Sequence, residues 1–270
     1  MNNKEEIAIK DLSLKRDIFT IHNSFNNAKI DLSPLAFDLF FLLVAHIAKE
    51  HKVLYCYRTS QSEIQTIFNK RIKKESIESA AQELLNVICE FTIDERVIEI
   101  PLSSKFEYDG GNIEFKLDDA LIDIVLKKES KFTIASFNEL IPLKSVYAKR
   151  LYLLFKQFSI KKEYMMHLDH IYKVLNLEGK YERYSHFKNR ILNPAIRLIN
   201  EKTSLNVSMR ELTKNRTVQR IKFDINSTKK EKKSGYSGLD ALKAWYANQE
   251  KREIEEAEIV NSTTCNKIVS

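Results

Sequence analysis

The sequence predicts an α+β, helix-rich fold made of two tandem winged-helix domains and a flexible C-terminal tail. The main observation is an order of elements (helix, short strand, helix, helix, β-hairpin) that occurs twice along the 270 residues. This order is typical of the winged-helix variant of the helix-turn-helix, in which the hairpin is the wing. The composition indicates a mostly globular chain, because 43% of the residues are hydrophobic and only five glycines and four prolines occur.

The first half begins with a strongly apolar helix at Pro34, for which Ser33 is the expected N-cap. A short strand in VLYCYRTS follows, and then a helix in SQSEIQTIF, where Ser60 and Glu63 have the spacing of a capping box. The basic turn NKRIKK leads into a third helix, SIESAAQELLNVI, whose apolar residues share one face. Alternating residues from about 89 to 117, around a DGGN turn, predict a β-hairpin.

The second half repeats this order after a bridging helix, DDALIDIVLK, and a strand-like segment, KFTIASF. Its first helix is SVYAKRLYLLFKQF, and a short strand in EYMMHL and a short helix in DHIYKVLNL follow. The next helix is longer and covers residues 184–202, YSHFKNRILNPAIRLINEK. Two alternating strands, LNVSMREL and TVQRIKFDI, are joined by the polar turn TKNR and form the second predicted wing.

We expect four regions along the chain. Residues 1–28 form an N-terminal arm, residues 29–135 the first winged-helix domain and residues 136–226 the second. After Asn226 the composition changes to the lysine-rich linker STKKEKKSGYSG, so residues 227–270 are expected to be a linker and a largely disordered or helical tail.

The helix over residues 184–202 has one apolar face and one face of hydrogen-bonding side chains when residues are placed at about 100° steps. Arginine can bind guanine and asparagine can bind adenine through two hydrogen bonds, each pair giving ~1–3 kcal/mol of base discrimination. A solvated surface is the alternative interpretation, but no acidic residue occurs between residues 183 and 200. The polar face and its flank carry His186, Lys188, Asn189, Arg190, Asn193 and Arg197. The wing residues that suit DNA phosphates are Lys214, Asn215, Arg216 and Arg220.

Pro194 lies inside this helix, where a proline typically costs about 3 kcal/mol or more. Either the helix bends there, or Asn193 caps a second helical segment that has Pro194 at its first position. We favour one bent helix. In both cases the residues before Pro194 form the segment presented to DNA.

The net charge and the cysteine pattern limit which classes of protein this chain can belong to. Lysine and arginine (44) outnumber aspartate and glutamate (37), a net charge of +7 that is compatible with nucleic-acid binding without requiring it. The three cysteines, Cys56, Cys89 and Cys265, are far apart and predict neither a disulfide framework nor a zinc site. The first residues, MNNKEEIAIKDL, contain no apolar core of a signal peptide. We therefore expect a cytoplasmic location and no membrane association.

We expect no catalytic site, metal or cofactor. None of the six histidines forms a His-x-His pair, and His167 and His170, three residues apart, are more often structural than metal-binding. No G-x-x-x-x-G-K-[ST] phosphate-binding loop occurs, which argues against ATP-driven unwinding. Packing is the better explanation for Tyr147 and Tyr152 on the SVYAKRLYLLFKQF helix, and Phe40, Phe41, Leu42 and Leu43 are expected in the core.

Three segments together carry a resemblance to a known family: SVYAKRLYLLFKQF, YSHFKNRILNPAIRLINEKTSLNVSM and TVQRIKFDI. They resemble the initiator replication proteins of iteron-containing plasmids, the Rep_3-type family, and the similarity extends over about residues 20–226. It implies a bacterial, nucleoid- or plasmid-associated protein whose monomers bind iteron repeats in double-stranded DNA at the plasmid origin. It also implies dimers, joined largely through the first domain, that repress their own promoter. The family melts an AT-rich region and recruits host replication initiator and helicase proteins.

The resemblance assigns the recognition helix of the second domain to residues 184–202. In the first domain the corresponding helix begins near Lys73–Ser76, but its exposed face is acidic, and carboxylates repel phosphate. We therefore expect the first domain to make accessory contacts through the preceding turn and the first helical turns. The residues expected to make these accessory contacts are Lys70, Arg71, Lys73, Lys74, Ser76 and Ser79.

Two other functions remain open on the same residues. A transcriptional repressor could use this scaffold without any initiator role. A nicking initiator of the rolling-circle type is the more distant alternative, because the metal-binding histidine pair is missing from the sequence.

Overall fold

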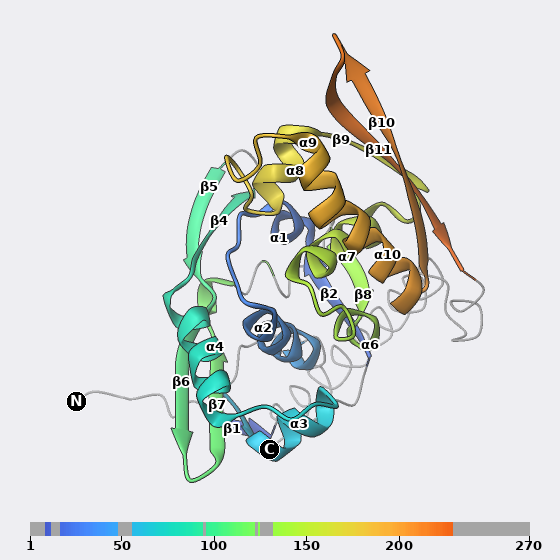
Figure 1. Cartoon of the computed structure of the whole chain (residues 1–270). Coiled ribbons are helices and arrows are strands. Elements are labelled where there is room, and N and C mark those ends of the chain that lie inside the picture. Colours follow the sequence, from blue (N-terminus) through green and yellow to red (C-terminus); the bar gives the residue numbers. More distant parts are fainter. Residues whose placement is uncertain are drawn as a thin grey trace, which may run out of the picture. The chain divides into compact units, whose positions relative to one another are not determined.

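The structure is a computed structural model that describes residues 9–11, 17–47, 56–93, 96–121, 124 and 132–228. The described residues up to Asn226 belong to one compact unit, shown in Figure 1. The predicted order of helix, strand, helix, helix and hairpin is present in both halves of this unit. The predicted tail, apart from residues 227–228, lies outside the described residues.

The first helix-turn-helix has the local signals that the sequence predicts. The Ala36 amide donates to Ser33 Oγ (3.3 Å), which confirms Ser33 as an N-cap. Ser60 and Glu63 make both bonds of the capping box. Helices α2 and α4 pack against each other and α3 connects them along the chain. The elements are β1 (Ile9–Asp11), β2 (Ile18–His22), α1 (Asn23–Asn27), α2 (Pro34–Ile47), β3 (Cys56–Ser60), α3 (Gln61–Ile67) and α4 (Lys74–Asn86).

The prediction of one hairpin between residues 89 and 117 is wrong, because this region forms two. The DGGN turn is confirmed: Gly110 and Gly111 both have positive φ, which a two-residue hairpin turn needs. The earlier hairpin was missed because the two residues between its strands, Asp94 and Glu95, include no glycine or asparagine to signal a turn. The strands are β4 (Ile88–Ile93), β5 (Arg96–Pro101), β6 (Ser103–Asp109) and β7 (Asn112–Leu117), and the larger sheet has the order β1-β3-β7-β6.

Residues 18–28, which the sequence places in an N-terminal arm, are part of the folded core. Strand β2 pairs antiparallel with β8 (Phe132–Ser136), and Phe19 and Phe25 are fully buried. The His22 side chain accepts a hydrogen bond from the Ser24 amide (3.2 Å) and so caps α1. Of the predicted bridging helix, the 3-10 turn η1 (Asp119–Leu121) and residue 124 are described.

The second half forms a helix-turn-helix followed by a long wing. Phe155 of its first helix packs on Phe223 of the wing with ring centroids 4.9 Å apart. The three-stranded sheet of the second half has the order β10-β11-β9, and β9 runs antiparallel to β11. The elements are α6 (Phe137–Leu140), α7 (Val146–Phe158), β9 (Glu163–His167), α8 (Leu168–Val174), α9 (Tyr184–Phe187), the π-helix η2 (Lys188–Leu192), α10 (Asn193–Lys202), β10 (Leu205–Lys214) and β11 (Thr217–Ser227).

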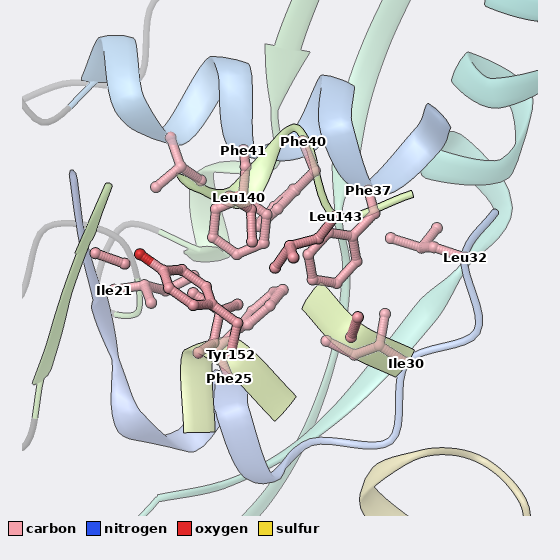
Figure 2. Close-up of a cluster of buried hydrophobic side chains, with 14 of the residues drawn as sticks. Ile21, Phe25, Ile30, Leu32, Phe37, Phe40, Phe41, Leu140, Leu143 and Tyr152 are labelled. Carbon is pink, nitrogen blue, oxygen red and sulfur yellow. The ribbon is translucent and has the colours of Figure 1, made fainter. Parts of the chain in front are cut away.

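An aromatic cluster fills the core beside α2. Phe25 stacks on Phe40 with centroids 5.0 Å apart and the ring planes within 5° of parallel. Such pairs add about 0.5–1.5 kcal/mol beyond the area that they bury. The predicted core residues Phe40, Phe41, Leu42 and Leu43 are all buried. Figure 2 shows this cluster, in which the side chains of Phe25, Phe37, Phe40, Phe41 and Tyr152 come together.

Helix α7 is buried on all sides between residues 148 and 155, although it contains Lys149 and Arg150. Lys149 Nζ lies 2.6 Å from Asp38 Oδ1 of α2 and donates to the Leu140 carbonyl (2.9 Å). Arg150 donates to the carbonyls of α1 and its C-cap, including Ala28. Burial raises the pKa of Asp38 and lowers the pKa of Lys149, and their close contact opposes both shifts. A buried ion pair therefore joins α7 to α2.

Breaking this pair should destabilise the protein strongly. Lys149→Met leaves Asp38 buried with only the solvent-facing Lys70 Nζ, 3.4 Å away, as a partner. We expect a loss of about 3–5 kcal/mol in the free energy of unfolding, because an uncompensated buried charge remains. The double variant Asp38→Leu/Lys149→Met should lose less than Lys149→Met alone, since no charge is left buried. Urea unfolding of the two single variants and the double variant measures this. Additive losses would contradict a direct pairing.

Candidate nucleic-acid interface

Residues 184–202 form one uninterrupted helical run, in which α9, η2 and α10 follow each other directly. Asn193 has helical dihedrals (φ −60°, ψ −48°), so the alternative in which it caps a second segment is wrong. Just before Pro194 the Asn193 amide bonds to the Lys188 carbonyl, five residues back, as in a π-turn. A π-turn relaxes the contact between the proline ring and the preceding turn. The favoured single helix is therefore confirmed, with a π-turn as the way in which it accommodates the proline.

The two faces of this helical run agree with the helical wheel. On the apolar side Phe187 is fully buried and packs on Tyr172 with centroids 4.5 Å apart. On the polar side the Asn193 amide group donates to Asn189 Oδ1 (3.3 Å), so the two amides stand together one turn apart. The exposed positions are His186, Asn189, Arg190, Asn193 and Arg197. This face can present hydrogen-bond donors and acceptors to base edges.

Lys188 differs from the other cations of the helix because it is engaged inside the protein. Its Nζ lies 2.6 Å from Glu211 Oε1 of β10, and the Tyr184 hydroxyl donates to the same carboxylate (2.9 Å). The hydrogen bonds from Lys188 and then Tyr184 lower the pKa of Glu211. Lys188 thus ties the helix to the wing. Sequence reasoning missed this role because the pairing depends on the register of β10 relative to the helix.

Arg190 and Arg197 have no ion-pair or hydrogen-bond partner among the described residues, and both are exposed. The same holds for Lys214, Arg216 and Arg220 of the wing. These five cations are therefore available to an anionic ligand without the loss of an internal contact. Figure 1 shows that the β10–β11 wing extends beyond the helices beside it.

The tip of the wing is a two-residue turn with an unusual residue. Asn215 (φ 53°) and Arg216 (φ 62°) both occupy the left-handed region, as a type I′ turn requires. Asparagine tolerates this conformation, whereas for arginine it costs roughly 1–2 kcal/mol, and glycine would avoid that strain. Arg216 therefore places a charge at the tip of the wing at the cost of backbone strain.

Arg216→Gly should therefore separate stability from binding. We expect an unchanged or slightly higher thermal unfolding temperature, because the backbone strain disappears. Affinity for duplex DNA should fall, and the slope of log K against log salt should become shallower by roughly one unit, because a phosphate contact is lost. Thermal unfolding and a salt titration of DNA binding measure the two effects. A variant that is less stable but binds DNA normally would contradict a role in binding.

The cations predicted to contact DNA in the first domain divide into two kinds. Lys70 is held near Asp38, and Lys74 lies 3.6 Å from Glu78 and 4.4 Å from the centroid of the Tyr108 ring. Arg71 and Lys73 are exposed and have no such partner among the described residues. Ser76 and Ser79 are also exposed on α4. The structure thus leaves two of the four predicted cations of this domain free.

Within the described part of the chain, no group of three or more histidine, cysteine, aspartate or glutamate side chains is placed to hold a metal ion. His170 instead approaches Asn27 Oδ1 (3.3 Å), and burial lowers the pKa of His170.

Among the described residues no helix is long and apolar enough to cross a membrane. Cys56 and Cys89 are buried and free.

Comparison with known proteins identifies the family. Residues 18–156 match the model of the initiator replication protein domain WH1, and residues 167–225 match that of the initiator Rep protein domain WH2. The fold resembles the crystal structure of Pi initiator protein in complex with iteron DNA. The TM-score is 0.62 at 17% identity, covering 78% of this chain and 97% of that chain.

A crystal structure of RctB domains 2–3 matches with a TM-score of 0.42 at 12% identity, over 76% of this chain and 87% of that chain. No curated protein matches the sequence. The two family models together cover most of the compact unit. The chain therefore belongs to the initiator replication protein family, whose members are DNA-binding proteins without catalytic activity, and it contains both winged-helix domains of that family.

Proposed function

We propose that this protein initiates plasmid replication by binding iteron repeats in the double-stranded DNA of the origin. The observation that carries the proposal is the arrangement of free groups on the second domain. Exposed amides and cations of the helical run over residues 184–202 stand beside a wing in which Lys214, Arg216 and Arg220 have no partner among the described residues. The fold that the chain shares with Pi initiator, which is bound to iteron DNA in its crystal structure, supports the same function.

The roles divide by chemistry. His186, Asn189 and Asn193 supply hydrogen bonds to base edges, which carry sequence information. Lys214, Arg216 and Arg220 of the wing, with Asn215 at its tip, hold the DNA backbone, which adds affinity and salt dependence. In the first domain Arg71 and Lys73, with Ser76 and Ser79, make accessory contacts. Lys70 and Lys74 contribute there only if they leave their present partners.

Asn193→Ala should weaken binding to the origin repeats while leaving binding to unrelated duplex DNA nearly unchanged. A lost base contact costs ~1–3 kcal/mol of discrimination and removes no charge. Gel-shift titration with the DNA beside the gene and with a scrambled duplex measures both affinities. Lys202→Ala, an exposed cation at the end of α10, is the matched control and should behave as the wild type.

Footprinting on the DNA beside the gene distinguishes an initiator from a protein that only represses transcription. Protection of tandem direct repeats, with permanganate reactivity appearing in an adjacent AT-rich tract once host replication proteins are added, supports the initiator. Protection of a single inverted repeat at a promoter, without melting, would leave a repressor as the function. The sequence has no phosphate-binding loop for ATP, so we propose that host initiator and helicase proteins complete the unwinding.

We further propose that the protein represses its own promoter as a dimer that forms through the first domain. Strand β5 pairs only with β4 among the described residues, so one edge of its backbone is open. Val97 and Ile98 on β5 and Ile88 on β4 are exposed (63%, 38% and 62%). An open, apolar edge strand can pair with the same strand of a second copy.

Val97→Lys should therefore lower the dimer fraction, because a charge on an edge strand opposes pairing with a second copy. DNA binding by the monomer should persist. Sedimentation over a range of protein concentrations measures the equilibrium. Glu107→Lys, on the edge strand β6 of the other sheet, is the control and should leave it unchanged. An unaltered dimer in Val97→Lys would exclude this edge as the interface.

A further inference from the structure

The surface between α10 and the beginning of α7 has a hollow of about 240 Å³. Arg190 and Arg197 line it from the recognition helix, and Ser145 and Tyr147 line it from α7. Pro194 and Leu198 belong to its apolar lining. His186, Asn189 and Asn193 are not among the lining residues. The two arginines therefore share a site with a second helix and not with the amides on the exposed face.

The polar groups of the residues that line this hollow have donors to offer. Among the described residues neither guanidinium has an ion pair, and the Ser145 hydroxyl makes no capping hydrogen bond to α7. Tyr147 is partly buried, and burial first, then Tyr181 and Asp31, raises the pKa of its hydroxyl, which stays a donor at neutral pH. The first amides of a helix also lack intrahelical acceptors. Glu201 is the carboxylate among the described lining residues, at the end of the hollow formed by the last turns of α10.

We propose that this hollow holds a backbone phosphate of the bound duplex. Arg190 and Arg197 then bind the phosphate oxygens instead of reading bases, and Tyr147 and Ser145 complete the site with hydroxyl donors. Base reading is left to Asn189, Asn193 and His186. The inference rests on the proposed DNA-binding function and deepens it, because it adds two contact residues and assigns the arginines of the helix to one DNA strand.

The chemistry favours a phosphate over a base edge. Two arginines and two hydroxyl-bearing residues that line one hollow match an oxyanion that has several acceptors and no donor. A base edge that offers a single pair of acceptors would not use all four groups. A phosphate lies at the rim of the groove, which agrees with a site shared by the flank of the recognition helix and a neighbouring helix. The contact would fix how deeply the helix enters the groove.

Salt titrations of three variants that remove a donor, and of Glu201→Gln, test the proposal with the full chain. Arg190→Ala and Arg197→Ala should each weaken binding to the origin repeat and to a scrambled duplex by the same factor, about tenfold or more for a charged hydrogen bond. Each should also reduce the slope of log K against log salt by roughly 0.9, the value for one phosphate. Tyr147→Phe should weaken both by about 2- to 10-fold with the slope unchanged, because a neutral donor is lost. Glu201→Gln should strengthen both.

Ethylation interference locates the phosphate. The wild type should show one strongly interfering phosphate per repeat whose effect disappears in Arg197→Ala and Tyr147→Phe but persists in Lys202→Ala. Inorganic phosphate at millimolar concentration should not compete with the duplex at constant ionic strength; competition would show a site for the free anion and overturn the assignment to DNA.

Loss of specificity in Arg190→Ala or Arg197→Ala with an unchanged salt slope would also overturn the proposal, because it would show base reading. So would normal affinity in all three variants. A wild type that binds no DNA specifically would instead contradict the proposed function itself.

Discussion

The ion pair between Lys149 of α7 and Asp38 of α2 is the constraint on which the rest of the molecule depends. Helix α7 has no solvent-facing side between residues 148 and 155, so it must satisfy each polar group that it carries within the protein. Lys149 does so through Asp38 and the Leu140 carbonyl. Arg150 does so in part: its Nη2 donates to carbonyls near α1, while its buried Nε has no hydrogen-bond partner among the described residues. Because these partners come from the first half of the chain while Phe155 packs on the second wing, α7 holds both halves in one unit.

This arrangement also places the proposed DNA-binding surface. The Tyr152 hydroxyl of α7 donates to Glu139, which in turn accepts from the Ser204 amide just after α10. The end of the recognition helix is thereby held near the beginning of α7, where the hollow with Arg190 and Arg197 lies. At its other end the helix is held by Lys188 and Tyr184 on Glu211 of the wing. A groove-reading surface needs this rigidity, because a displacement of about 1 Å already disturbs a site of this kind.

Sequence reasoning predicted most elements because their signals are local. The caps of Ser33 and Ser60, the DGGN turn and the two faces of residues 184–202 depend only on neighbours along the chain. It failed where the turn signal is weak or the partners are distant. The β4–β5 hairpin has no glycine or asparagine between its strands, and the segment at residues 18–28 joins the core by pairing with β8. Neither feature is visible within a short window of sequence.

The sequence by itself determined the double winged-helix order, the exposed face of the recognition helix and the residue types suited to DNA. Periodicity and capping chemistry act within a few residues, so they can be read directly. Only the tertiary structure decided which of those residues are free. Lys188, Lys70 and Lys74 pair with carboxylates, whereas Arg190 and Arg197 pair with none among the described residues and line a hollow with Ser145 and Tyr147. The physical reason is that the availability of a charge depends on what the fold brings within about 4 Å of it, the range of an ion pair.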